Sequence, residues 1–208
     1  MTDLDGLLTD ISKDGCMARE VATGFRVIFE GAMPGGQVAP EAERVDKDSV
    51  RIGDQIWMDH NLQMPADPKN GIFVENGETY FTWDAAMKVS SSCGNGWRLP
   101  SRGDWAVLVS NCGGKRKAGF HLKTVDGWDG KGGDNAYGFG GIPAGYYKAD
   151  SWMSSKLEWD GSLGLFWTST PKGENDAYYR NLHARADDLF EDYYSKNYGM
   201  SVRLVKDA

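Results

Sequence analysis

The sequence contains little cysteine and no long apolar run. Its 208 residues include three cysteines, Cys16, Cys93 and Cys112, an odd and small number that cannot form a disulfide framework. If two of them pair, we expect Cys93 and Cys112. No stretch approaches the ~20 apolar residues that a membrane-spanning helix needs, so we expect no membrane insertion.

Positive charge is also scarce. The chain has 23 Lys and Arg against 30 Asp and Glu, a formal net charge of −7. Nucleic-acid-binding domains concentrate basic residues on one face, and the run at 115–117 is too short for that, so no nucleic-acid partner is expected. The first residues are acidic where a secretory signal would be basic and then apolar. The chain as given therefore shows no signal peptide and its compartment is not specified by the sequence; assembly onto a virus particle and display at a cell surface after export both stay open.

Glycine and aromatic residues are abundant. The chain contains 27 Gly, 8 Trp, 9 Tyr and 8 Phe, and its mean hydropathy is −0.52. Glycine favours tight turns, and the aromatic rings supply large apolar bodies for a core, although Tyr and Trp also suit contact surfaces. The length fits one domain. These features predict a loop-rich α+β domain rather than a helical bundle.

Residues 1–50 differ from the rest and read as an appended segment. An apolar, strand-like run at 25–29 is followed by a turn-rich stretch at 34–36. An edge strand, an attachment arm or an oligomer contact would each fit this segment. A ligand-binding domain is expected over 51–208, opening at 52–58 with an apolar–polar alternation that is typical of a half-buried strand.

Two helices are predicted ahead of a strand-rich half. The first covers 83–89, and Ser101 suits the N-cap of the second, with Trp105 and Leu108 following at helical spacing. Further on, strands are predicted at 166–169, 177–182 and 200–205.

Seven ordered motifs carry a family resemblance. They include IGDQIWMDHNL at 52–62, YFTWDAA at 80–86 and CGNGWRLPS at 93–101, and the others lie at 118–128, 135–146, 166–170 and 198–207. In this order they resemble the Fibrobacter succinogenes major paralogous domain family, which is similar to the formylglycine-generating-enzyme-like branch of the C-type-lectin fold. The resemblance implies a C-type-lectin-like fold with two short helices and a small antiparallel sheet core.

Two departures from the family pattern affect the cysteines and one motif. Leu204 stands where many members have cysteine, which leaves Cys93 to pair with Cys112 or with none. Gly94 replaces a proline. Independently of the family, the motif at 96–100 reads as a turn that buries Trp97 before a helix, and Arg203 reads as a structural hydrogen-bond donor.

Catalytic constellations are missing from the sequence. His60, His121 and His183 are scattered outside any metal-binding spacing. The reactive cysteine pair of formylglycine-generating enzymes has no counterpart, since no cysteine follows Cys112. We therefore expect no enzyme; carbohydrate chemistry through Asp126 and Asp134 is the weaker alternative.

No cofactor is expected either. The Glu-Pro-Asn and Gln-Pro-Asp triplets through which C-type lectins hold calcium are absent. The loop at 126–135 has carboxylate oxygens and flexible glycines but not the spacing of a known calcium loop. It is interpreted as a solvated loop, with a structural calcium ion as the alternative.

The segment 174–198 has the composition of a binding surface. It is rich in Tyr, Asn, Asp, Ser, Arg and His, a mixture that paratopes favour because Tyr gives contact area at low entropic cost. Leu182, Leu189 and Phe190 would anchor it inside. Alternatively, Tyr178 and Tyr198 are core residues and the acidic residues form a solvated face.

The same segment resembles the variable region of retroelement-diversified proteins, which place variable residues just before a closing strand. The resemblance implies a receptor-binding or adhesin-like display protein for a protein or glycan on a target cell surface. A fixed structural subunit of a phage particle or cell surface is the alternative. The expected ligand-binding residues are Tyr178, Tyr179, Asn181, His183, Arg185, Asp187, Asp192, Tyr193, Tyr194 and Asn197.

Overall fold

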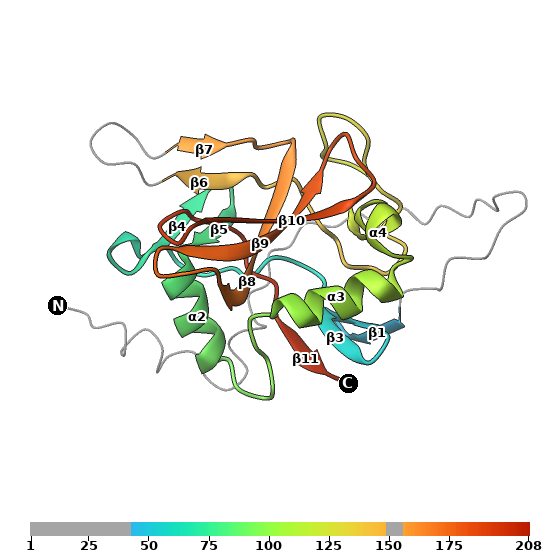
Figure 1. The fold of residues 1–208 in the computed structure, drawn as a ribbon, viewed down its shortest axis with the longest axis horizontal. Helices are drawn as coiled ribbons and strands as arrows, with labels where there is room; N and C mark the ends of the chain where they lie inside the picture. Colours follow the sequence, from blue (N-terminus) through green and yellow to red (C-terminus); the bar gives the residue numbers. More distant parts are fainter. Residues whose placement is uncertain (1–42, 149–155) are drawn as a thin grey trace, which may run out of the picture.

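A computed structural model describes residues 43–148 and 156–208. Within these ranges the chain forms three α-helices and four small antiparallel sheets (Figure 1). The predicted α+β class is therefore confirmed. The predicted features at 25–29 and 34–36, and Cys16, lie outside the described residues.

The helices are α2 (Trp83–Ser92), α3 (Arg102–Asn111) and α4 (Lys115–Leu122), with a short 3₁₀ turn at Pro68–Asn70. The strands are β1 (Glu43–Asp46), β2 (Ser49–Ile52), β3 (Gln55–Met58), β4 (Ile72–Glu75), β5 (Glu78–Phe81), β6 (Tyr146–Lys148), β7 (Lys156–Glu158), β8 (Leu163–Pro171), β9 (Asp176–His183), β10 (Leu189–Ser195) and β11 (Val205–Asp207).

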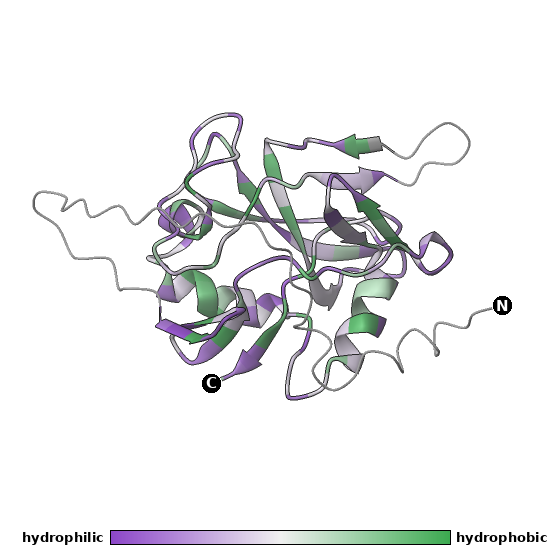
Figure 2. Ribbon diagram, turned by 180° about the vertical axis from the view of Figure 1, so that it is seen from behind, coloured by the Kyte–Doolittle hydropathy of each residue, from purple (hydrophilic) through white to green (hydrophobic). Residues whose placement is uncertain are grey.

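The first sheet has the strand order β1-β2-β3-β11. The alternating stretch at 52–58 is not one half-buried strand as predicted, because Gly53, with a φ of 63°, turns the chain between β2 and β3. All four residues of β3 are buried. Hydrophilic residues dominate β1 and the tip of β11 at the rim of the molecule (Figure 2). The expected domain boundary at residue 50 falls inside β2, so β1 and the start of β2 share this sheet.

Both predicted helices are confirmed, and their caps explain where they begin. The Thr82 side chain accepts a hydrogen bond from the backbone N–H of Ala85 at the start of α2. Ser101 and Asp104 form a reciprocal capping box at the start of α3, which satisfies two otherwise unpaired backbone donors. The Trp105 side chain is fully buried beneath α3.

The third helix, α4, was not predicted. It begins after Gly114 with no side-chain cap, and it contains Gly119 in its middle. A Cβ atom at Gly119 would lie 2.2 Å from the carbonyl oxygen of Asp188. The glycine that weakens the helical pattern is thus the residue that lets α4 approach the loop between β9 and β10.

The closing segment is buried on both sides. Residues 200–205 were predicted as a strand, but the final strand covers only Val205–Asp207, and isolated bridges join Met200 to Phe81 and Ser201 to Phe166. Ser201 and Arg203 are as buried as Val202, which lies between them. The alternation of buried and exposed residues that a half-buried strand would show is therefore absent, because other segments of the fold cover both sides.

Arg203 is a fully buried cation at the centre of the fold, and its predicted role as a hydrogen-bond donor is confirmed. Its Nε donates to Asn61 Oδ1 at 3.0 Å, and its terminal nitrogens donate to the carbonyl oxygens of Met58, Phe139 and Gly140. The guanidinium also lies 4.4 Å from the ring centroid of Phe139. Burial lowers the pKa of Arg203, and the ring of oxygens compensates for lost hydration.

Lys123, at the end of α4, is a second fully buried cation. Its Nζ donates to the carbonyl oxygens of Lys131, His183 and Ala186 at 2.9–3.0 Å. Burial lowers the pKa of this amine. One ammonium group therefore joins the Gly-rich loop after α4 to the connection between β9 and β10.

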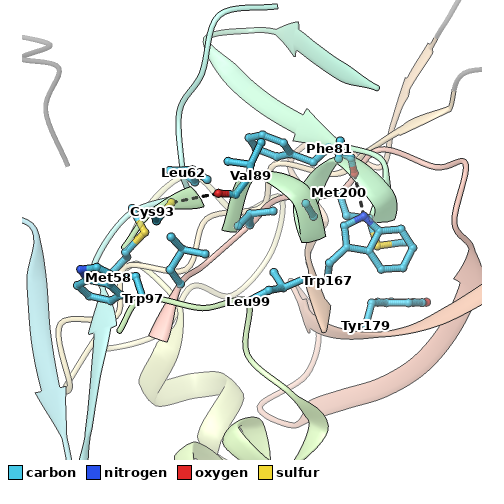
Figure 3. Close-up of a cluster of buried hydrophobic side chains, with 14 of the residues drawn as sticks. Met58, Leu62, Phe81, Val89, Cys93, Trp97, Leu99, Trp167, Tyr179 and Met200 are labelled. Carbon is cyan, nitrogen blue, oxygen red and sulfur yellow. Dashed lines mark hydrogen bonds between the residues drawn. The ribbon is translucent and has the colours of Figure 1, made fainter. Parts of the chain in front are cut away.

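Cys93 and Cys112 lie in different clusters of the core. Cys93 is disulfide-bonded and lies in the cluster that contains Trp97, Trp167 and Met200 (Figure 3). Cys112 is a free buried thiol in a second cluster, and burial raises its pKa to about 12. The predicted pairing of Cys93 with Cys112 is therefore wrong.

Replacing Arg203 with Met is expected to lower the free energy of unfolding by about 3–5 kcal/mol, because four buried oxygen atoms lose their donor. Urea denaturation at pH 7 measures this. The matched change Arg116→Met, at an exposed position, should stay within about 0.5 kcal/mol of the parent. If Arg203→Met does not fold, Arg203→Lys, which keeps the charge but not the fork of donors, should fold with intermediate stability. Parental stability of either Arg203 variant would contradict this role.

Candidate functional site

The predicted binding segment forms the central strand β9 and the edge strand β10 of a three-stranded sheet with the order β10-β9-β8. In the pairing register Tyr193 lies opposite Tyr178, whereas Asp192 lies opposite Tyr179 and Tyr194 lies opposite Ala177. Directly paired residues point to the same face of a sheet, and successive residues point to opposite faces. The sheet therefore separates the predicted ligand residues onto two faces.

One face, here called the tyrosine face, carries Tyr179 and Tyr194 together with Tyr146 from β6 and Tyr198 from the following turn. The Tyr194 centroid lies 4.4 Å from that of Tyr198 and 6.0 Å from that of Tyr146. Tyr179 connects this group to the core, with its centroid 6.4 Å from that of Trp167 (Figure 3). Aromatic rings thus run without a break from the buried core to the surface.

A shallow depression of about 510 Å³ opens beside the tyrosine face at the edge strand β10. Tyr193 and Tyr194 are 43% and 39% exposed there, whereas Tyr179 is 9% exposed. The Tyr194 ring is therefore available for contact, and Tyr179 is held by packing. Tyr193 points to the opposite face, where the Lys172 ammonium lies 3.0 Å from its ring centroid. The depression is lined by Asp176, Tyr179, Asp192, Tyr193, Tyr194, Ser195 and Tyr198.

Burial raises the pKa of two tyrosines at this surface. It raises the pKa of Tyr179 to about 12, with Asp192 adding to the effect. It also raises the pKa of Tyr146 to about 12, where Tyr194 is both a charge neighbour and a hydrogen-bond partner. At neutral pH the hydroxyl groups of Tyr179 and Tyr146 are therefore neutral, and the formal negative charge of the depression belongs to Asp176 and Asp192.

The opposite face of the sheet is occupied by interactions within the protein. The Arg102 guanidinium lies 4.0 Å from the ring centroid of Tyr178. Glu191 accepts from Arg102 on one oxygen and lies 2.7 Å from Arg180 on the other. The hydrogen bond from Arg102, followed by the charges of both arginines, lowers the pKa of Glu191. This cluster ties the start of α3 to β9 and β10.

The other predicted ligand residues lie away from the depression or face elsewhere. His183, Arg185 and Asp187 are at the far end of the β9–β10 hairpin, roughly 20 Å away by strand rise. The Asp187 carboxylate pairs there with Lys131 at 3.1 Å. Asn181 is partly buried beside Phe190 in the register. The expected single ligand face is thus divided among three places on the sheet, because strand geometry disperses residues that are adjacent in sequence.

Some lining residues were not predicted. Asp176 and Ser195 pair with each other across β9 and β10, and Tyr198 was considered only as a core residue. Period-two alternation along 176–183 and 189–195 could have identified the faces. Tyr146 could not have been found this way, because it reaches the site from β6.

Leu182 and Leu189 are fully buried, as predicted for anchors, whereas Phe190 is only partly buried and points to the tyrosine face. Tyr178 and Tyr198 are also partly buried, which places them between the two alternatives of core and surface.

The candidate catalytic and metal groups do not converge in the described part of the chain. His60 contacts Asp59, His121 contacts Asp134, and the His183 ring accepts from the backbone N–H of Arg185. Within residues 43–148 and 156–208, no three His, Cys, Asp or Glu side chains gather as metal ligands would. In the Gly-rich loop, Asp129 accepts from Ser162 rather than joining its neighbours.

These features define a class: a small α+β domain that presents a tyrosine-lined surface at the edge of a sheet. The family model described as the Fibrobacter succinogenes major domain matches residues 50–206, and the chain belongs to this family. No curated protein matches the chain, and neither does any solved structure. Among the described residues, no helix combines the length and apolar character needed to cross a membrane.

Glu191→Gln is expected to lower the free energy of unfolding at pH 7 by about 0.5–1 kcal/mol, a figure typical of partly exposed ion pairs. Because the folded-state pKa of Glu191 is lowered, its contribution is present above the unfolded pKa of about 4.3 and is lost as pH falls through the folded value. The difference from the parent should therefore shrink below about pH 4. Urea titrations at several pH values measure it, with Glu75→Gln as an exposed control. A pH-independent difference would contradict this assignment.

Proposed function

We propose that the chain is a non-enzymatic ligand-binding protein, receptor-binding or adhesin-like, that contacts its partner through the tyrosine-lined depression. The observation that carries the proposal is the exposed ring of Tyr194, which stands on an edge strand above a buried aromatic support of Tyr179 and Trp167. The partner would be a protein or a glycan on a target cell surface, and the binding needs no cofactor.

The chemistry of the surface supports binding. Tyrosine gives a large contact area while fixing few side-chain torsions, and its hydroxyl can donate or accept a hydrogen bond. Aromatic anchors account for much of the free energy in many interfaces. The exposed Tyr194 ring, which packs against Tyr179 and Tyr198, is therefore suited to contact a partner.

The support of the surface is rigid, as a preformed binding site requires. The Trp167 indole donates to the carbonyl oxygen of Phe81 at 2.8 Å, which fixes β8 to β5 (Figure 3). The Thr168 hydroxyl donates to the carbonyl oxygen of Tyr178 at 2.8 Å. The tyrosines thus stand on strands whose positions are set by buried hydrogen bonds.

The proposal includes a C-type-lectin-like fold and natural diversification of the hairpin by a retroelement. Its support is the separation of roles along β9 and β10. Ala177, Leu182 and Leu189 are fully buried, whereas Asp192, Tyr193 and Tyr194 are exposed on the edge strand. Substitutions at the exposed positions would change the contact surface with little effect on the core.

The binding function is tested by replacing one exposed ring. The domain is screened against a printed glycan panel and a displayed peptide library, and the best binder is titrated by calorimetry. Tyr194→Ala is expected to weaken binding at least tenfold, about 1.4 kcal/mol, because it removes the central ring of the tyrosine face. The melting temperature should change by only a few degrees.

The matched control is Tyr178→Ala on the opposite face, which should alter affinity less than about threefold. Equal losses from both variants would show that the tyrosine face is not the binding surface. A concentration-dependent mass with no external ligand would instead favour a fixed structural subunit.

Diversification is tested by sequencing codons 174–198 in a natural population, together with the neighbouring DNA. Variation is expected at Asp192, Tyr193, Tyr194 and Asn197, concentrated in Asn-derived codons beside a near-copy repeat. Buried Leu182 should remain constant. A uniform segment without a repeat would mean a fixed binder, and variation spread equally over buried positions would contradict the proposed surface.

A further inference from the structure

The depression has a negative formal charge that no cation in its lining balances. Asp176 and Asp192 line it beside four tyrosines, and none of its lining residues is Lys, Arg or His. Within the described residues neither carboxylate forms an ion pair, although Asp192 accepts a hydrogen bond from the backbone N–H of Tyr193 at 2.8 Å. Each carboxylate therefore has oxygen lone pairs available to a ligand.

Aromatic rings around this end of the sheet already attract cations of the protein itself. The Lys172 ammonium lies 3.0 Å from the Tyr193 centroid, and the Lys196 ammonium lies 4.5 Å from that of Trp83. The negative face of an aromatic ring attracts a cation by about 0.5–2 kcal/mol, depending on how far the pair is desolvated. The surroundings thus favour positive groups at the rings.

We infer that the depression binds the ammonium or guanidinium group of a lysine or arginine side chain on a protein partner. The ring of Tyr194 would contact the apolar stem and the charged head, and Asp192, which projects to the same face of the sheet, would supply the opposite charge. This inference rests on the proposed function and specifies its ligand. The charge of the whole chain agrees with it, because a net charge of −7 attracts basic partners and repels acidic ones.

A neutral sugar is the competing ligand, since it too can stack on tyrosine and accept or donate hydrogen bonds. It would not require formal charge on the protein. The two ligands therefore differ in how their affinity responds to the removal of a carboxylate and to salt, and these responses decide between them.

The experiment uses two short peptides of Gly and Ser that differ only at the central residue, lysine in one and uncharged norleucine in the other. Each is titrated into the full ¹⁵N-labelled chain, and the amide signals of Tyr193, Tyr194 and Ser195 are followed. The lysine peptide is expected to shift these signals with a dissociation constant in the millimolar range, and the norleucine peptide is not. Raising the salt concentration should weaken the lysine peptide.

Asp192→Asn is expected to weaken the lysine peptide at least fivefold. Asp126→Asn removes the same charge from an exposed loop and should change affinity less than twofold. Equal shifts from both peptides, equal effects of both variants, or no shift up to about 10 mM lysine peptide would overturn the inference.

The failure of this inference can be distinguished from failure of the proposed function. A neutral glycan whose affinity falls with Tyr194→Ala but not with Asp192→Asn would leave the binding surface in place and refute the cationic ligand. Insensitivity of every recovered ligand to Tyr194→Ala would refute the binding surface itself. Melting temperatures of all variants confirm that the fold is retained.

Discussion

The fold depends on the burial of one guanidinium group. Arg203 donates to oxygen atoms from the end of β3, from Asn61 and from the turn at 139–140. A buried charge without partners would be prohibitively costly, so these segments can only pack together when the carbonyl groups all point at the arginine. Asn61 extends the network by donating to the Glu78 carboxylate at 2.9 Å, so a negative group acts on the cation from a distance without touching it. Local segments with little secondary structure are thereby fixed in one arrangement.

The same solution recurs at Lys123, whose ammonium is surrounded by three carbonyl oxygens. A chain with a net charge of −7 could have paired both cations with carboxylates, but carbonyl groups belong to the backbone and are unaffected by side-chain substitution. The loop after β9 is thus held by its main chain at His183 and Ala186. These hydrogen bonds do not depend on which side chains stand at His183 and Ala186, and the proposed diversification of the hairpin would need such independence.

The sequence predicted those parts of the fold that local signals determine. Ser101 begins α3 because its side chain and that of Asp104 cap the helix reciprocally, and this pattern is visible without a structure. The helix α4 was missed because Gly119 is needed for close contact with the β9–β10 loop, a constraint that acts across 69 positions in the chain. The division of the tyrosines between two faces follows from strand alternation once β10 is recognised. The contribution of Tyr146 depends on the placement of β6, which no local pattern specifies.

In the proposed function, the two faces of the β10-β9-β8 sheet separate contacts within the protein from contacts with a partner. On one face Tyr178 and Glu191 are engaged by arginines, so their interactions are already formed before any ligand arrives. On the other face, Tyr194 packs on Tyr179, with 6.5 Å between the two ring centroids. Among the described residues, no lysine or arginine lies over the Tyr194 ring. Because alternate residues on one strand belong to different faces, a substitution at Tyr194 would leave the contacts of Glu191 and Tyr193 with basic side chains on the opposite face in place. Under the proposed function, edge strand β10 would therefore present a changed surface to a partner without rebuilding the sheet that holds it.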